Sequence, residues 1–276
     1  MEDAETGYAK LNLALHIRRR EPDGYHEIET LFVFVEDGDR LSFTAEPGLR
    51  LSGEFADGLE AGPSNLVMRA ARGFAERFGE GEPTGFLLEK RLPVAAGIGG
   101  GSADAGAALR LLARRRGLDP ADPRLIDLAA TLGADVPACL VSMPVRGEGR
   151  GERLTAAQGV PSGIAALLVN PRLPLATGPV FGGWDGIDRG PLAQGDAMAA
   201  AQAGRNDLEA PAVKVIPEIA ELLALLRAQE GARLARMSGS GATCFALFPS
   251  QSARDAADRA VAAARPEWWR LPTRLR

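Results

Sequence analysis

The opening of the chain alternates between apolar and polar residues. From residue 11 to residue 17, every second residue is leucine or isoleucine. A period of two is typical of a half-buried strand, so we expect a strand here. Lys10, Asn12 and His16 then share its other face.

A turn and two more strands are expected next. Residues 21–24 read Glu-Pro-Asp-Gly, and these residue types favour a tight reversal of the chain. Tyr25 and His26 emerge directly from that turn. Residues 30–35 and 40–45 have the pattern of further strands, so the opening of the chain is strand-rich.

Helical spacing appears after a polar loop. One helix is expected to start near Asn65, and a second over residues 103–116, where alanine and leucine recur at helical intervals. A third helix is expected after Asp122, because aspartate caps helices and the next residue is proline. It ends near Gly133, and Asp135 lies just beyond it.

Strand and helix patterns are mixed in the second half of the chain. The expected elements are strands over residues 164–170, 233–237 and 244–248, and helices over residues 217–229 and 252–264. Mixing without regular alternation favours an α+β fold over a doubly wound sheet. A length of 276 residues predicts about two domains. We place them at residues 1–155 and 156–276, with the charged, glycine-rich residues 146–152 as the crossing.

Composition and charge narrow the class of protein. Apolar residues make up 46% and charged residues 25%, as in ordinary folded domains. A net charge of −4 argues against a partner that is nucleic acid or an anionic membrane. Cys139 and Cys244 lack the spacing of a disulfide framework or a zinc site. With an acidic start and no long apolar run, the expected location is the cytoplasm.

The strongest local signal is the glycine-rich loop over residues 93–102. Successive backbone N–H groups in such a loop can approach an anion, and the following helix adds its positive end. The loop therefore predicts a phosphate site; the alternative is a tight loop with no ligand. No Gly-Lys dipeptide exists, which excludes a Walker A motif, and Ser102 stands where G-x-G-x-x-G needs its third glycine.

Two polar residues at the end of this loop have alternative interpretations. The Ser102 hydroxyl either caps the helix or faces the β- and γ-phosphates and their Mg²⁺, for which it is the candidate contact. Asp104, in the first helical turn, is expected to be a favourable partner of the helix dipole rather than a ligand.

Lysine is rare in this chain, with Lys10, Lys90 and Lys214 as its three examples. Asp135 has apolar neighbours, where an unpaired carboxylate would be costly; otherwise it is a turn-forming residue. A Lys10/Asp135 pair would suit phosphoryl transfer, because the carboxylate can accept a hydroxyl proton while the ammonium offsets phosphoryl charge.

Three weaker signals leave their alternatives open. His26 beside Tyr25 is either a binding residue or a surface loop residue. His16 on the strand face is either functional or a satisfied structural group. The Ser-Gly-Ser-Gly cluster at residues 238–241 is either a second anion site or an ordinary β-turn.

Seven short motifs, taken in order, resemble the GHMP kinase superfamily. The glycine-rich loop and the Gly-Ser-Gly motif near the C-terminus indicate only the superfamily, whereas A-K-L-N combined with D-G-Y-H is specific to a much narrower family. Together they extend over nearly the whole chain. They lie at residues 9–13, 22–26, 65–67, 93–104, 133–137, 206–209 and 237–242.

The resemblance implies a fold and a reaction. The fold would be a two-lobed GHMP kinase fold of α+β class, with an N-terminal lobe like ribosomal protein S5 domain 2, a C-terminal ferredoxin-like lobe and the active site in the cleft between them. The reaction would transfer the γ-phosphoryl of ATP, with Mg²⁺, to the 2-hydroxyl of 4-diphosphocytidyl-2-C-methyl-D-erythritol in the non-mevalonate isoprenoid pathway. The expected oligomeric state is a monomer or weak homodimer.

The resemblance also implies site residues. Lys10 and Asp135 match the catalytic pair. The positions that match the ATP site are Asn65, Pro93, Ala95, Ala96, Gly97, Ile98, Gly99, Gly100, Gly101 and Ser102. The positions that match the substrate site are Asn12, Tyr25, His26, Thr177 and Phe181, with Tyr25 and Phe181 on the two faces of the cytosine ring and His26 at its edge.

Some features depart from the family pattern, and two other functions compete with the one implied. Ala103 stands where many members have a second serine, and residues 143–149 match only loosely. One rival is another small-molecule kinase of the same superfamily, of homoserine or mevalonate type. The other is a nucleotide-binding regulator without catalysis, against which the presence of Lys10 and Asp135 argues.

Overall fold

The computed structural model describes residues 4–79 and 85–276. The chain divides into two compact units: unit 1 takes residues up to 10, 37–94 and 99–142, and unit 2 takes residues 11–36, 95–98 and 143–276. Strands β1 (Ala4–Arg20) and β2 (His26–Thr44) each run from one unit into the other. The glycine-rich loop is likewise divided, its middle belonging to unit 2.

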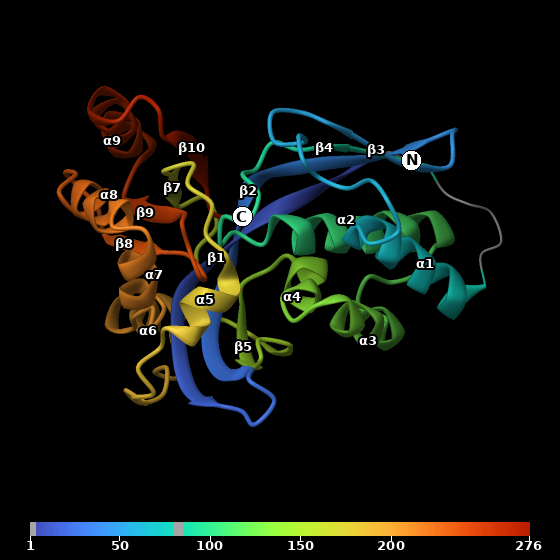
Figure 1. Cartoon of the computed structure of the whole chain (residues 1–276), viewed down its shortest axis with the longest axis horizontal. Coiled ribbons are helices and arrows are strands. Elements are labelled where there is room, and N and C mark those ends of the chain that lie inside the picture. Colours follow the sequence, from blue (N-terminus) through green and yellow to red (C-terminus); the bar gives the residue numbers. More distant parts are fainter. Residues whose placement is uncertain (1–3, 80–84) are drawn as a thin grey trace. The chain divides into compact units, whose positions relative to one another are not determined.

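Unit 1 packs helices against short strands. The end of β2 pairs antiparallel with β4, and β3 pairs parallel with β4. Four helices pack on one another (Figure 1), and alanine and leucine side chains from α2 fill much of the core beside Phe74 and Phe86. Its further elements are β3 (Gly48–Ser52), α1 (Leu66–Phe78), β4 (Gly85–Glu89), α2 (Gly100–Arg116), α3 (Pro123–Leu132) and α4 (Val136–Val141).

Unit 2 contains a four-stranded antiparallel sheet in the order β10-β7-β9-β8. Helices α8 and α9 pack against this sheet (Figure 1). The start of β2 pairs with β5, and β5 pairs with β6. The further elements are β5 (Val145–Gly149), β6 (Arg153–Ala156), β7 (Ala165–Asn170), α5 (Thr177–Gly182), α6 (Ala197–Ala203), α7 (Glu209–Val215), α8 (Glu218–Arg227), β8 (Leu234–Met237), β9 (Cys244–Phe248), α9 (Gln251–Ala264) and β10 (Trp269–Arg274).

The α+β class and most of the expected elements are confirmed, but the expected break between two early strands is wrong. Residues 30–35 and 40–45 belong to the single strand β2. The polar stretch between them stays in the strand because the Asp39 carboxylate is buried against Lys90. Gly38 also approaches Gly7 so closely that a Cβ atom at Gly38 would meet the Gly7 carbonyl.

The expected crossing at residues 146–152 is also wrong. These residues form the β5–β6 hairpin inside unit 2, because β5 pairs with Ile28–Phe32 of β2. The chain changes unit between Ser142 and Met143 instead. The proposed domain boundary at residues 155 and 156 stays a prediction. None of the helices in the described ranges combines the length and apolar character needed to cross a membrane.

Candidate active site

The Lys10 ammonium group and the Asp135 carboxylate lie together in unit 1. Lys10 is on β1, and its Nζ atom is 3.0 Å from Oδ2 of Asp135. The Lys10 side chain is only 4% exposed, whereas that of Asp135 is 34% exposed. The pair therefore offers an accessible carboxylate whose partner is a buried cation.

Asp135 precedes helix α4 without capping it. It occupies the N-cap position, but its side chain makes no cap hydrogen bond and pairs with Lys10 instead. The alternative of a purely turn-forming aspartate is therefore wrong. The next helical residues, Val136 and Pro137, are buried, so packing holds this backbone while the carboxylate remains partly open.

The N-terminus of α2 lies beside this pair. Gly99 is its N-cap residue with φ 67°, and a Cβ atom there would lie 3.1 Å from Cε of Lys10. Any side chain at Gly99 would thus be strained and would crowd the lysine. The first N–H groups of a helix have no acceptor within it, so this end can receive an anion next to Lys10.

The structure excludes one interpretation of Ser102. Helix α2 begins at Gly100, three residues earlier than expected, and Gly99 is its cap. Ser102 therefore stands inside the first turn, and its hydroxyl is not the cap. The other interpretation, a contact to phosphate and Mg²⁺, stays a prediction. The described residues include no group of three or more metal-ligating His, Cys, Asp or Glu side chains.

The middle of the glycine-rich loop is held by the β8–β9 turn in unit 2. The Ser238 hydroxyl donates to the Gly97 carbonyl at 2.9 Å, and the Thr243 N–H donates to the Ala96 carbonyl at 3.1 Å. A Cβ atom at Gly97, where φ is 75°, would clash with the backbone of Ser238 and Gly241. The cluster at residues 238–241 is thus a turn that fixes this loop.

Asn12 is buried in the same unit. Its side-chain amide donates to the Thr30 hydroxyl at 2.8 Å, and its backbone N–H donates to the Ser238 hydroxyl at 3.2 Å. The Asn12 Oδ1 atom would lie 3.3 Å from a Cβ atom at Gly239. Ser238 therefore joins Asn12 to the glycine-rich loop.

Tyr25 and His26, which are expected at the substrate site, have different surroundings. Tyr25 is 58% exposed, whereas His26 is 7% exposed. The His26 ring lies 5.2 Å from that of Phe181 and 5.7 Å, edge to face, from that of Trp184. Burial, together with the Arg20 charge, lowers the pKa of His26, so its neutral ring can donate one hydrogen bond and accept another near pH 7.

Thr177 and Asn65 make local contacts. Thr177 begins α5, the helix that carries Phe181, and its hydroxyl lies 3.2 Å from that of Ser240. Asn65 caps α1 by accepting from the Val67 N–H at 2.9 Å and donates to the Glu60 carbonyl. The Asn65 side chain therefore already serves the helix start, and a contact with ATP stays a prediction.

His16 is a satisfied structural residue. Its Nε2 accepts the Arg205 N–H and its Nδ1 faces the Gly190 carbonyl, both at 3.2 Å. Burial, with the Arg205 charge, lowers its pKa. Both nitrogen atoms of the neutral His16 ring therefore already have hydrogen-bond partners within the protein.

A second group of ion-paired side chains, centred on Lys90, was not expected from the sequence. Lys90 binds the buried carboxylates of Asp39 and Asp104, the latter at 2.7 Å. Asp39 also accepts the N–H groups of Arg91 and Leu92, which lead into the glycine-rich loop. The first turn of α2 contains no acidic residue, so the expectation that Asp104 lies there as a partner of the helix dipole is wrong.

Trp184, Asn206 and Arg236 were given no role from the sequence, although Asn206 opens the motif at residues 206–209. Trp184 gave no signal beyond being one of three tryptophans. Asn206 donates to the carbonyls of Met237 and Gly239, both at 2.8 Å, and so supports the β8–β9 turn. Arg236 is buried and donates to backbone carbonyls, and burial lowers its pKa to about 10.

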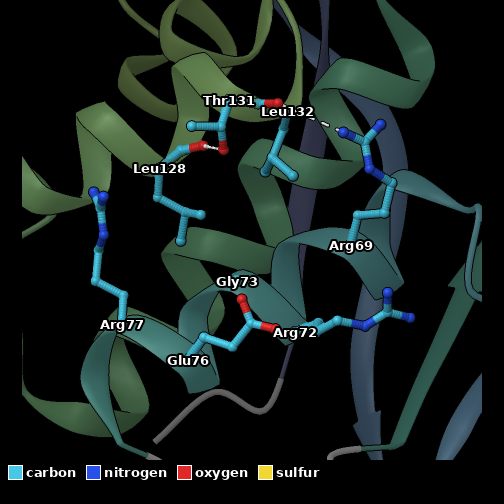
Figure 2. Close-up of a pocket in the computed structure, with 8 residues that line it drawn as sticks. All are labelled: Arg69, Arg72, Gly73, Glu76, Arg77, Leu128, Thr131 and Leu132. Atoms are coloured by element: carbon cyan, nitrogen blue, oxygen red, sulfur yellow. Dashed lines mark hydrogen bonds between the residues drawn. The ribbon is translucent and has the colours of Figure 1, made fainter.

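A hollow of about 450 Å³ lies elsewhere in unit 1, between α1 and α3 (Figure 2). None of the predicted site residues lines it. Arg69 donates to the Thr131 carbonyl near the end of α3, and Arg77 donates to the Arg124 carbonyl. These arginines join the two helices, and the hollow is separate from the candidate site.

The chain matches two family models. Residues 65–143 match the GHMP kinase N-terminal domain, and residues 190–267 match the GHMP kinase C-terminal region. The resemblance inferred from the sequence motifs is thus confirmed at the level of the superfamily.

Named relatives narrow the family. The chain is 62% identical to 4-diphosphocytidyl-2-C-methyl-D-erythritol kinase of Rhizorhabdus wittichii, over 100% of this chain and 96% of the relative. It is 53% identical to the enzyme of that name from Novosphingobium aromaticivorans, over 99% and 92%.

Solved structures agree with the relatives. A crystal structure of 4-(cytidine 5'-diphospho)-2C-methyl-D-erythritol kinase superposes with a TM-score of 0.78 at 34% identity, covering 99% of this chain and 98% of that one. A homoserine kinase from Cytophaga hutchinsonii has a TM-score of 0.68 at 17% identity, over 100% and 95%, and shares the fold alone. The chain belongs to the GHMP kinases and, within them, to the 4-diphosphocytidyl-2-C-methyl-D-erythritol kinase family.

Proposed function

We propose that this chain transfers the γ-phosphoryl group of ATP to the 2-hydroxyl of 4-diphosphocytidyl-2-C-methyl-D-erythritol. The observation that carries the proposal is the Lys10–Asp135 pair beside the Gly99 end of α2. A proton acceptor, a cation and an anion-receiving helix end then lie within one unit. These are the groups that phosphoryl transfer needs.

The proposed reaction uses the pair in a defined way. The acceptor oxygen forms a bond to the γ-phosphorus, and the bond from that phosphorus to the β,γ-bridging oxygen breaks to release ADP. The hydroxyl proton passes to the Asp135 carboxylate, whose exposure makes it reachable. The Lys10 ammonium offsets the charge on the moving phosphoryl group, and the buried position of its side chain strengthens that effect.

The glycine-rich loop is proposed to hold the triphosphate. Gly99, Gly100 and Gly101 have no Cβ atom, so their backbone can approach phosphate oxygens closely. Mg²⁺ in such sites is bound largely through substrate phosphates and water, and the Ser102 hydroxyl in the first turn of α2 fits as a protein contact. When bound, the ion would neutralise phosphate charge.

The acceptor is proposed to be recognised through its cytidine. Tyr25 offers an exposed ring face, and the neutral His26 ring beside Phe181 can read the edge of a base. Stacking of a base on an aromatic ring is worth about 1–3 kcal/mol. Asn12 and Thr177 are proposed to contact the rest of the acceptor.

Two further statements belong to this proposal. We place the protein in the cytoplasm, which agrees with the free, buried thiols of Cys139 and Cys244. We also expect a monomer or weak homodimer. Sedimentation of the purified protein over a range of concentrations tests the oligomeric state.

The test is ADP release with a panel of acceptors. We expect rapid release with 4-diphosphocytidyl-2-C-methyl-D-erythritol and little with 2-C-methyl-D-erythritol, homoserine or mevalonate. Equal turnover with and without the cytidine diphosphate group would refute cytidine recognition. If no ADP is released with any of the four acceptors, the proposed reaction itself is refuted.

A further inference from the structure

The β5–β6 hairpin brings Arg150 beside the turn that carries Tyr25. Gly149 at the end of β5 pairs with Ile28 of β2, two residues after His26. Strand register therefore places the tip of the hairpin next to the start of β2. Figure 1 shows β5 in green next to the blue turn between β1 and β2, within unit 2.

Arg150, Asp23 and Tyr25 form a closed set of contacts at this place. The Arg150 guanidinium lies over the Tyr25 ring, 4.0 Å from its centroid, and it is ion-paired with the Asp23 carboxylate. The other oxygen of Asp23 accepts the Tyr25 backbone N–H at 3.1 Å. Asp23 thus joins the backbone of Tyr25 to the cation that covers its ring.

Hydrogen bonds of backbone N–H groups fix the two chain segments that carry these residues. The turn is closed by the Glu21 N–H donating to the Tyr25 carbonyl at 2.7 Å. The Arg150 N–H donates to the Glu152 carboxylate at 2.7 Å. The hydrogen bond from Tyr25, followed by the Arg150 contact, lowers the pKa of Asp23, so this carboxylate stays charged at neutral pH.

These contacts bear on how Tyr25 binds a base. An exposed aromatic side chain that has to be ordered on binding costs free energy that a fixed one does not. Arg150 occupies one face of the ring and leaves the other face for a ligand. The ring is thereby held before the ligand arrives.

We propose that Arg150 is a positioning residue for acceptor recognition, which acts by holding the Tyr25 ring ready to stack on cytosine. The inference rests on the proposed function, because it takes Tyr25 as the cytosine-stacking residue. Arg150 was not among the residues predicted from the sequence, and no site motif includes it.

Kinetics of Arg150→Ala test the proposal. The KM for the acceptor should rise roughly two- to fivefold, equivalent to about 0.5–1 kcal/mol for an exposed cation–π contact. The KM for ATP and kcat should not change. Arg150→Lys should recover only part of the loss, because lysine lacks the planar group that stacks. Arg153→Ala, on the same hairpin and 62% exposed, is the matched control and should leave all three constants unchanged.

A double-mutant cycle with Tyr25→Ala separates positioning from direct contact. If Arg150 acts through Tyr25, then Arg150→Ala should have no further effect in the Tyr25→Ala background. An equal effect in both backgrounds, or no effect in the parent, would overturn the inference. If Tyr25→Ala leaves the acceptor KM unchanged, cytidine stacking in the proposed function fails as well, whereas a loss in Tyr25→Ala alone sinks only the Arg150 inference. Thermal melting of each variant checks that the fold is intact.

Discussion

Two of the three lysines of this chain have buried side chains that pair with carboxylates in unit 1, and the two sites differ in the exposure of those carboxylates. Lys10 pairs with the carboxylate of Asp135, whose side chain is 34% exposed. Lys90 has two partners, Asp39 and Asp104, whose side chains are 0% and 5% exposed. One pair is open on its carboxylate side and the other is closed.

Because of this difference, we assign a reactive role to the open pair and a structural role to the closed cluster. A closed carboxylate cannot meet a substrate hydroxyl, and Asp39 is further engaged by the N–H groups of Arg91 and Leu92. The closed cluster instead ties the strand that enters the glycine-rich loop to the helix that leaves it, because Lys90 follows β4 and Asp104 lies in α2. The open pair is therefore the one that the proposed reaction uses.

The closed cluster also differs from the open pair in its balance of charges. Two carboxylates face one ammonium, and the Oδ1 atom of Asp104 is buried with no hydrogen-bond partner among the described residues. Burial raises the pKa of Asp104 to about 8, against the opposing effect of Lys90. Burial alone would lower the pKa of Lys90, but the carboxylates of Asp104 and Asp39 raise it overall. A protonated Asp104 makes the cluster neutral.

The largest change on the closed side should come from Lys90→Met. Removing the cation leaves the buried Asp39 carboxylate without its counter-charge, and breaking such a pair costs about 3–5 kcal/mol. Urea unfolding measures this loss. Lys214→Met, at the exposed lysine in the last turn of α7, is the control and should change the unfolding free energy by less than about 0.5 kcal/mol. Equal losses of unfolding free energy for the two variants would show that the closed cluster does not stabilise the fold.

The closed cluster should also make the free energy of unfolding depend on pH. Folded Asp104 keeps its proton up to about pH 8, whereas an unfolded aspartate loses it near pH 4. The folded state then binds more protons, so this residue makes the unfolding free energy fall as the pH rises from about 4 to 8, by at most about 1.4 kcal/mol per pH unit.

Asp104→Asn removes this titration. The difference in unfolding free energy between parent and variant, measured at several pH values, cancels the contributions of His16 and His26. We expect Asp104→Asn to become relatively more stable with rising pH. A pH-independent difference would mean that Asp104 is ionised throughout.

The open pair could be predicted from the sequence, and the closed cluster could not. Lys10 and Asp135 lie in motifs of the GHMP kinases, and the rarity of lysine drew attention to Lys10. The same rarity applies to Lys90, but its partners come from β2 and α2, 51 and 14 residues away. Such pairings depend on the tertiary fold, and local pattern does not contain them.

The same reason explains the errors in the fold. Residues 36–39 have the local character of a turn, yet they remain in β2 because Asp39 pairs with Lys90, the residue that follows β4. The glycine-rich residues 146–152 are typical of a linker, yet they form a hairpin because β5 pairs with β2. Helices α1 and α9, in contrast, each begin one residue from their expected starts.

The most direct test of the open pair is the turnover of Asp135→Asn, with Asp104→Asn as the matched change in the closed cluster. The asparagine at position 135 cannot take the hydroxyl proton, so we expect kcat to fall about 10²–10⁴-fold while the affinity for ATP, measured by calorimetry, is retained. Asp104→Asn should keep most of its turnover at neutral pH. Turnover of Asp135→Asn within a few-fold of the parent would contradict the assignment of this pair as the centre of the reaction.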